Sequence, residues 1–179
     1  RSGLRESLPP QSHYFVEGDS HKRFNPAGPQ HAQVAGCHGV LEYFDALHRH
    51  HGGNETASTR ERLQSVYALT ANYEEQLAAP LLDYLDHSPQ VRLLGKNHGK
   101  DSDRPATLAF EPVNSSSSDV AAALQCLDIG CEHGHFYAHR LLRNLGVDPS
   151  TGVVRISLVH YNTRSEVDKI LAALDRVLA

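Results

Sequence analysis

The stretch Gly152-Val-Val-Arg-Ile-Ser-Leu-Val-His-Tyr-Asn-Thr-Arg-Ser-Glu-Val-Asp168 predicts a β-strand followed by a helix. The β-branched and aliphatic residues from Val153 to Val159 favour an extended strand. Thr163 and Glu166 form a capping box, in which a hydroxyl and a carboxylate bind free amides at the start of a helix. Apolar residues then continue as one helical stripe: Val167, Ile170, Leu171, Leu174, Val177 and Leu178.

Arg155 places a guanidinium in the middle of this apolar strand. Because such strands usually pack inside a protein, we expect Arg155 to be buried, and buried charges are usually paired. The residues alone leave two interpretations open. Arg155 either belongs to the structure, in an internal salt bridge or facing water on an edge strand, or it binds a carboxylate or phosphate through its planar fork.

Three further helices are indicated upstream. A helical pattern of apolar residues begins at Gln30, and a second capping box, Ser58–Glu61, begins a long helix that contains Pro80. Proline removes a backbone donor, so a kink is expected there. The serines at 115–118 are expected to cap a helix over 119–127.

Short strands are indicated between these helices, over 91–94, over 106–110 and from Ile129 onward. Short strands that alternate with helices favour a two-layer α/β domain. We therefore expect a small sheet with helices covering one face.

Composition and charge exclude several classes of protein. The chain has 179 residues, of which 40% are hydrophobic, and its 17 basic and 21 acidic residues give a formal net charge of −4. This balance indicates neither nucleic-acid binding nor attraction to an anionic membrane. No apolar run approaches the roughly 20 residues of a membrane helix. Three cysteines form no disulfide framework, so a reducing, cytoplasmic setting is expected.

The chain contains no methionine and starts at Arg1. A natural reading frame begins with methionine, so we expect the sequence to be a segment of a longer protein.

The chain resembles the class V aminotransferases, the pyridoxal-phosphate enzymes that include the cysteine desulfurases. The run VRISLVHYNTRSEVDKILAAL resembles the C-terminal signature of that family, and GHFYAHRLLRNLG before it resembles a desulfurase-like branch. Two upstream stretches, His13–Asp19 and Lys22–Gly36, are similar to the segment that joins the large domain of the family to its small domain. The resemblance therefore covers nearly the whole chain.

The resemblance implies the C-terminal small domain of a fold type I pyridoxal-phosphate enzyme. Residues 1–29 would connect to a large domain that is missing here, and residues 30–179 would form the small domain. The parent would be a transferase or lyase that acts on an amino acid as a homodimer, with pyridoxal phosphate as cofactor.

The resemblance also assigns roles to residues. Arg155 matches the arginine that binds the α-carboxylate of the substrate, and His135 and Tyr137 are candidates for the substrate entrance. Tyr137 stands where desulfurases have their reactive cysteine. Gly28 lies in a stretch that resembles a family turn whose Gly-Thr pair contacts the cofactor phosphate of the partner subunit. The matching pair here is Ala27-Gly28, which lacks the hydroxyl, so a contact could come only from a backbone N–H, and a plain interdomain turn is the alternative.

No catalytic residue is matched in this segment. Lys22 lies where the family has the segment after the cofactor lysine, so it is interpreted as a linker lysine, and the isolated chain is expected to be inactive.

Two alternatives remain open. Cys131, His133, His135 and His139 are acceptable metal ligands by type, with the last two at i, i+4 on an expected helix. The chain could also be a non-catalytic interaction module that keeps the small-domain fold without cofactor chemistry.

Overall fold

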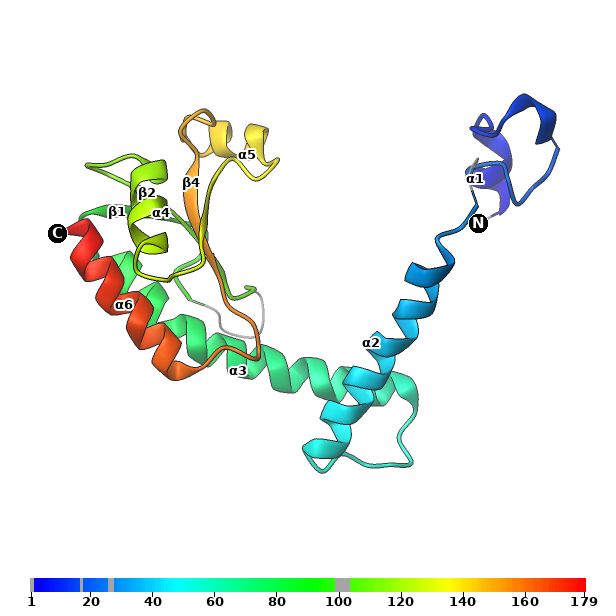
Figure 1. Ribbon diagram of the computed structural model, residues 1–179, viewed down its shortest axis with the longest axis horizontal. Helices are drawn as coiled ribbons and strands as arrows, with labels where there is room; N and C mark the ends of the chain where they lie inside the picture. The colour runs from blue at the N-terminus through cyan, green and yellow to red at the C-terminus, as the bar shows by residue number, and fades with distance from the viewer. Residues whose placement is uncertain (1, 17, 26–27, 99–103) are drawn as a thin grey trace. The chain divides into compact units, whose positions relative to one another are not determined.

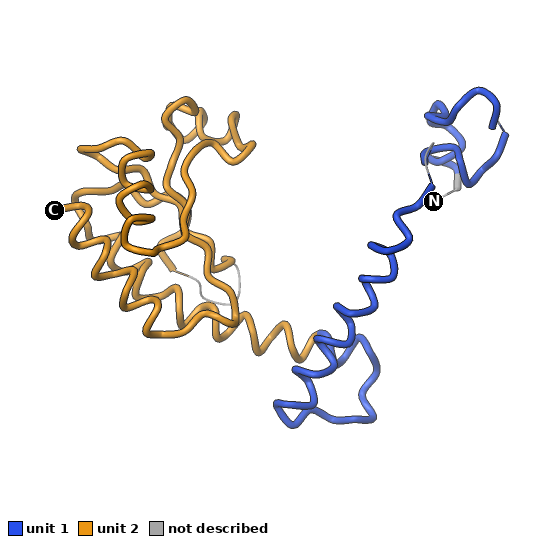
Figure 2. Tube along the Cα trace, in the orientation of Figure 1, with its two compact units in different colours: residues 1–63 blue, residues 64–179 orange. Residues whose placement is uncertain are grey.

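The computed structural model describes residues 2–16, 18–25, 28–98 and 104–179 (Figure 1). The chain divides into two compact units, residues 1–63 and residues 64–179 (Figure 2). Each unit is described by itself.

The N-terminal unit contains short helical segments and one long helix. These are α1 (Ser2–Ser7), a 3-10 turn (Tyr14–Val16) and α2 (His31–His50). The Arg23 guanidinium donates hydrogen bonds to the backbone carbonyls of Arg5, Glu6 and Leu8, at 3.1, 3.0 and 2.6 Å. The helix expected from Gln30 is confirmed, because α2 begins at the next residue.

His48 lies in the last turn of α2. Its side chain is buried, and its Nε2 lies 3.1 Å from the carbonyl oxygen of Asn54. A Cβ atom added at Gly53 would lie 2.2 Å from the Cε1 of His48. Only glycine therefore allows the chain to turn this closely over the imidazole ring.

The described residues of the C-terminal unit form a four-stranded antiparallel sheet in the order β1-β2-β4-β3. The strands are β1 (Val91–Leu94), β2 (Thr107–Pro112), β3 (Glu132–Gly134) and β4 (Val153–Ser157). The last strand in the sequence, β4, therefore lies between β2 and β3 and is not an edge strand.

Three helices supply apolar side chains to one face of the sheet. They are α3 (Thr59–His87), α4 (Ser117–Gln125) and α6 (Arg164–Leu178). The shorter α5 (His139–Asn144) contributes Leu142 to a separate small cluster on the other face. The predicted two-layer α/β arrangement, with a short sheet covered by helices, is confirmed.

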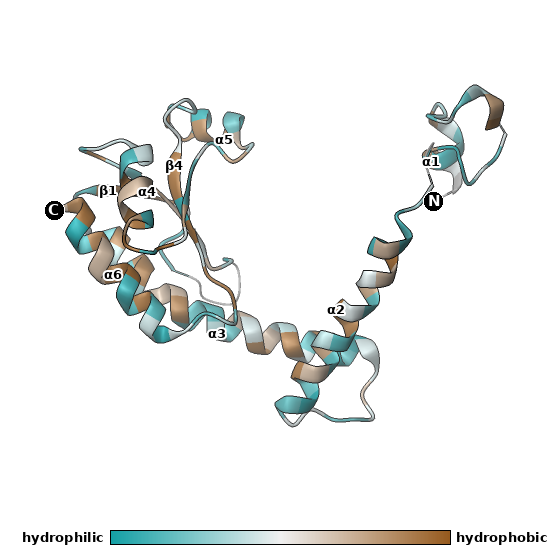
Figure 3. Cartoon of the chain, in the orientation of Figure 1, coloured by the Kyte–Doolittle hydropathy of each residue, from teal (hydrophilic) through white to brown (hydrophobic). Residues whose placement is uncertain are grey.

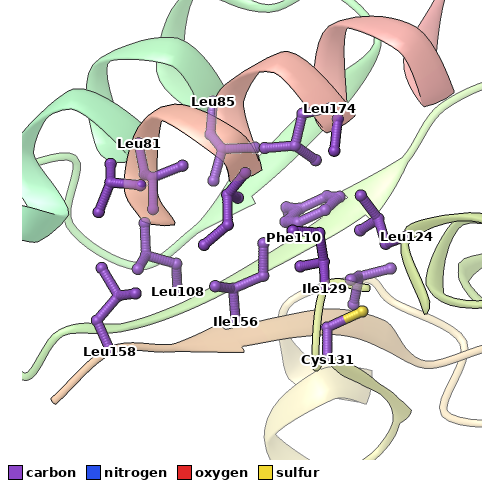
Figure 4. Close-up of a cluster of buried hydrophobic side chains, with 14 of the residues drawn as sticks. Leu81, Leu85, Leu108, Phe110, Leu124, Ile129, Cys131, Ile156, Leu158 and Leu174 are labelled. Carbon is purple, nitrogen blue, oxygen red and sulfur yellow. The ribbon is translucent and has the colours of Figure 1, made fainter. Parts of the chain in front are cut away.

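The main core lies between this layer of helices and the sheet (Figure 4). Alternate strand residues point into it, namely Leu108 and Phe110 from β2 and Ile156 from β4. Leu81 and Leu174 meet them from α3 and α6, and all five side chains are at most 2% exposed. Burying each such side chain contributes about 1.5–3 kcal/mol.

The caps read from the sequence are formed. The Glu61 carboxylate accepts the backbone N–H of Ser58 at 2.8 Å. Ser116 accepts the N–H of Asp119 at 3.1 Å and so caps α4. At α6, the complete capping box joins Thr163 and Glu166. These bonds satisfy amide groups that a helix leaves free at its start.

Hydropathy follows the same division of surface and core. Hydrophobic and hydrophilic residues alternate along α6 in Figure 3, as expected for a helix with one buried stripe.

Pro80 lies within α3, which continues to His87. No helix among the described residues combines the length and the apolar character that crossing a membrane requires.

Candidate functional site

The face of the sheet opposite the main core carries the candidate site. On β4, Val154 and Ile156 point into the core, so Val153, Arg155 and Ser157 point to the other face. Val153 is covered by the small cluster that includes Leu142. Beyond this cluster, the described residues leave Arg155 and Ser157 exposed on what is called the open face.

Arg155 is exposed, and the expectation that it is buried was wrong. The physical reason is strand alternation: side chains of an antiparallel strand point to opposite faces, and here only one face is packed by the main core. An apolar neighbour on each side therefore says nothing about the burial of the residue between them.

The Arg155 guanidinium lies over the ring of Phe136, with its Cζ 4.0 Å from the ring centroid. Within the described residues, no carboxylate forms an ion pair with Arg155 and no acceptor forms a hydrogen bond with its donors. The five N–H groups of a guanidinium lie in its plane, so a stacked ring leaves them available to a ligand.

The residues beside Arg155 on neighbouring strands differ in charge. Ala109 of β2 and Glu132 of β3 are its partners in register. Residues in such a pair share a face, with Cβ atoms about 4.5–5.5 Å apart. Glu132 is exposed, so Arg155 has a small neutral neighbour on one side and a carboxylate on the other.

His135 and Tyr137 lie in the turn between β3 and α5. Phe136 and Tyr137 both have left-handed backbones, with φ of 47° and 59°, and the N–H of Ala138 donates to the carbonyl of His135 at 2.7 Å. The Tyr137 N–H donates to Nδ1 of His135 at 3.1 Å. The Tyr137 side chain is fully exposed.

The turn places the two predicted entrance residues on either side of Phe136 in the sequence, and the Phe136 ring lies under Arg155. It also corrects the expected helix: α5 begins at His139, so His135 lies before the helix and not on it. The rings of His135 and His139 are still close, with their centroids 5.9 Å apart.

Cys131 points away from this turn. Its side chain is buried, and its Sγ lies 3.8 Å from the carbonyl oxygen of Ala121 in α4. Burial, and then the charge of Glu132, raise the pKa of the thiol. Among the described residues, no group of three or more His, Cys, Asp or Glu side chains is arranged to hold a metal ion. The metal-binding alternative therefore has no geometric support.

The described residues do not form a pyridoxal-phosphate site by themselves. Lys169 lies on α6, which packs on the core face of the sheet, and its Nζ lies 3.5 Å from the carbonyl oxygen of Asp128. Gly28 is exposed, with no atom within 4 Å of an added Cβ atom, so no cradle surrounds it. Its neighbour Ala27 lies outside the described residues. Lys22 is half-buried in the N-terminal unit.

A separate pocket of about 660 Å³ lies along α3. Asp83, Asp86 and Arg104 are among its lining residues, and burial lowers the pKa of Arg104. The pocket shares no residue with the open face around Arg155.

Phe136 and Glu132 are the residues that the sequence analysis missed. Phe136 directly follows the predicted entrance histidine, His135, and Glu132 lies three residues before it, so proximity along the chain was the available signal. The register that places Glu132 beside Arg155 depends on pairing between strands more than 20 residues apart, which one sequence does not reveal.

Comparison with known proteins identifies relatives along most of the chain. The aminotransferase class-V family matches residues 10–170. Aminotransferase-like protein FGM3 of Gibberella zeae is 36% identical over 124 residues, which cover 69% of this chain and 31% of that protein. A probable cysteine desulfurase of Synechocystis sp. is 35% identical over 165 residues, which cover 92% of this chain and 34% of that protein.

A solved structure agrees in fold. The crystal structure of the cysteine desulfurase CsdA (S-sulfonic acid) from Escherichia coli superposes with a TM-score of 0.62 at 28% identity, and the match covers 87% of this chain and 32% of that one. The chain spans about a third of the length of the curated relatives it matches. Sequence and fold together show that the chain belongs to the aminotransferase class-V family.

Proposed function

We propose that this chain is the C-terminal part of a pyridoxal-phosphate-dependent enzyme that acts on an amino acid, and that Arg155 binds the carboxylate of the substrate. One observation carries the role of Arg155. Its guanidinium is exposed on the open face of the sheet, and no carboxylate of the described residues pairs with it.

The chemistry of the guanidinium fits this role. Two parallel N–H groups of arginine match the two oxygens of a carboxylate, which fixes the orientation of the ligand as well as its position. Fixing the carboxylate presents one bond of the substrate to the reacting group, so positioning lowers the barrier. Arg155 thus acts by orientation and transfers no proton.

The cofactor would be bound mainly by residues outside the described set, since these form no cofactor site. When bound, pyridoxal phosphate supplies an electron sink for the substrate. We assign His135 and Tyr137 to the substrate entrance, because they lie in the same turn as Phe136, whose ring lies under Arg155. Gly28 stays a candidate for phosphate contact, through its backbone N–H alone.

The reaction is proposed to be a transferase or lyase reaction. Tyr137 stands where the desulfurases have a reactive cysteine, and a phenol cannot carry a persulfide. Cys131 does not replace that cysteine, because it is buried and its pKa is raised.

The setting of the enzyme is proposed from the family and from composition. We propose a cytoplasmic homodimer in which residues 1–29 connect to a large domain and residues 30–179 belong to the small one.

The test uses the longer protein encoded by the gene, loaded with pyridoxal phosphate. Arg155→Ala should keep the absorbance of the bound cofactor and weaken amino-acid binding by about 10–100-fold, the loss expected for a charge-assisted bidentate contact. Arg155→Lys is the matched control, since it keeps the charge but loses the fork.

Three outcomes would contradict the proposal. Loss of the cofactor in Arg155→Ala would make the residue structural, and unchanged amino-acid binding would remove its role. A longer protein that retains no cofactor after borohydride reduction would favour the non-catalytic module. The isolated chain should trap no cofactor under the same conditions, because no Schiff-base lysine is matched in it.

A further inference from the structure

The ring of Phe136 has two different surroundings. It packs against the small apolar cluster of Leu142, Val147 and Val153. It also lies under the guanidinium of Arg155, with Cζ 4.0 Å from the ring centroid. Because the cluster supports the ring, its position does not depend on Arg155. The ring therefore supports a long side chain that forms no hydrogen bond or ion pair with the other described residues.

The backbone that holds this ring is strained. Positive φ is disfavoured for bulky residues, yet Phe136 and Tyr137 adopt it in succession. Their φ values, with the hydrogen bond from Ala138 to His135, have the signature of a type I′ turn, for which Asn-Gly is the favoured sequence. Such strain persists where the surrounding structure maintains it, and it often marks a functional site.

The strain has an identifiable result. The bond from the Tyr137 N–H to Nδ1 of His135, at 3.1 Å, adds a second link within the turn. Together the two bonds hold Phe136 in a conformation that brings its ring beneath Arg155. Asn or Gly at position 136 would form the turn with less strain but would provide no aromatic face.

We infer that Phe136 is a positioning residue for Arg155, which orients the guanidinium so that its in-plane N–H groups meet a carboxylate. This inference rests on the proposed role of Arg155. A guanidinium over an aromatic face is held by cation–π attraction, and an ordered side chain loses less rotamer freedom when a ligand binds. Removing the aromatic face should therefore weaken carboxylate binding by about three- to tenfold.

The experiment uses the 179-residue chain and nuclear magnetic resonance. The side-chain Nε–Hε signal of Arg155 is assigned by its loss in Arg155→Lys. Sodium acetate is the probe, with sodium chloride at equal ionic strength as the reference titration. In the unaltered chain, the Arg155 signal should carry a ring-current shift and move saturably with acetate.

Three variants separate positioning from packing. Phe136→Leu keeps an apolar side chain in the cluster but should abolish the ring-current shift and weaken acetate binding by about three- to tenfold. Phe136→Tyr keeps the aromatic face and should preserve both. Leu142→Val makes a small change in the same cluster but keeps the aromatic ring, so it should also preserve both.

The outcomes are distinguishable. Acetate binding of equal strength in the unaltered chain and in Phe136→Leu would overturn the positioning role while leaving the carboxylate site intact. Loss of binding to the same extent in Leu142→Val, with the ring-current shift retained, would also overturn it, because packing alone would then explain the effect. Failure of acetate to bind the unaltered chain, with the ring-current shift present, would instead contradict the role proposed for Arg155.

Discussion

At the scale of single residues, the side-chain direction at Arg155 decides whether it is structural or available to a ligand. Its neighbours Val154 and Ile156 are almost fully buried, and the sequence suggests the same for Arg155. Because side chains alternate between the two faces of a strand and the main core packs on only one face, Arg155 is exposed instead. An exposed guanidinium needs no internal partner, so we expect the fold not to depend on it.

Replacing Arg155 with alanine should leave the protein nearly as stable as before. The variant loses only the contact with Phe136, so the free energy of unfolding should fall by about 1 kcal/mol or less. Breaking a buried ion pair would instead cost about 3–5 kcal/mol. Urea unfolding followed by circular dichroism measures the difference, with Ile156→Ala as a buried neighbour expected to lose about 2–5 kcal/mol.

Tyr137 offers a second prediction, because its side chain is fully exposed while its φ is 59°. Tyr137→Gly should remove the strain without losing a packed contact, and should raise the free energy of unfolding by about 0.5–1 kcal/mol.

The matched control is Tyr161→Gly, at an exposed tyrosine that is absent from the positive-φ residues, where glycine should lower stability. Thermal unfolding compares the two variants. A loss of stability at both positions would show that the turn at Tyr137 is not strained.

At the scale of elements, the sequence predicted best where a local signal exists. The strand at 91–94 was placed at its observed bounds, and the caps of α3, α4 and α6 were identified because capping depends on residues three positions apart. The strand expected at 106–110 is observed as β2, Thr107–Pro112. Burial and register depend on distant segments, so the exposure of Arg155 and its pairing with Glu132 could not be predicted from one sequence.

The capping box of α6 gives a prediction for a whole element. Thr163→Ala should lower the free energy of unfolding by about 1 kcal/mol, because the amide of Glu166 loses its acceptor. Thr163→Ser keeps the hydroxyl and should restore most of the stability. Equal stability of all three proteins in urea would mean that the cap contributes nothing.

The same cap should respond to acid. Hydrogen bonds from the Thr163 backbone, the Thr163 hydroxyl and the Asn162 side chain lower the pKa of Glu166. A carboxyl group whose pKa is lower in the folded protein adds stability above its ordinary pKa and loses it as the pH falls through the lowered value. Glu166→Gln should therefore flatten the acid side of the stability profile.

At the scale of the whole molecule, the main core belongs to one of the two units. Every member of that core lies between Leu77 and Leu178. The sheet, α4 and α6 belong to residues 64–179 as well, and so does α3 from Gln64 onward. The C-terminal unit thus contains the elements that a hydrophobic core requires.

A shortened chain of residues 58–179 should fold cooperatively by itself. It retains the core and the Ser58–Glu61 cap of α3. Calorimetry should show one unfolding transition, and the amide spectrum should keep the signals of the sheet. A broad, non-cooperative melt would contradict this prediction and show that residues 1–57 are required.

The alternation of β4 has a consequence for how such a protein can evolve. Residues that maintain the fold and exposed residues that are available to a ligand alternate along the same strand, as Ile156 and Arg155 do. Mutations on the exposed face should therefore cost little stability, while mutations of the buried residues on the opposite face should destabilise the fold. A library randomised at Ala109, Arg155 and Ser157 should consequently be rich in folded members, and is a practical starting point for directed evolution.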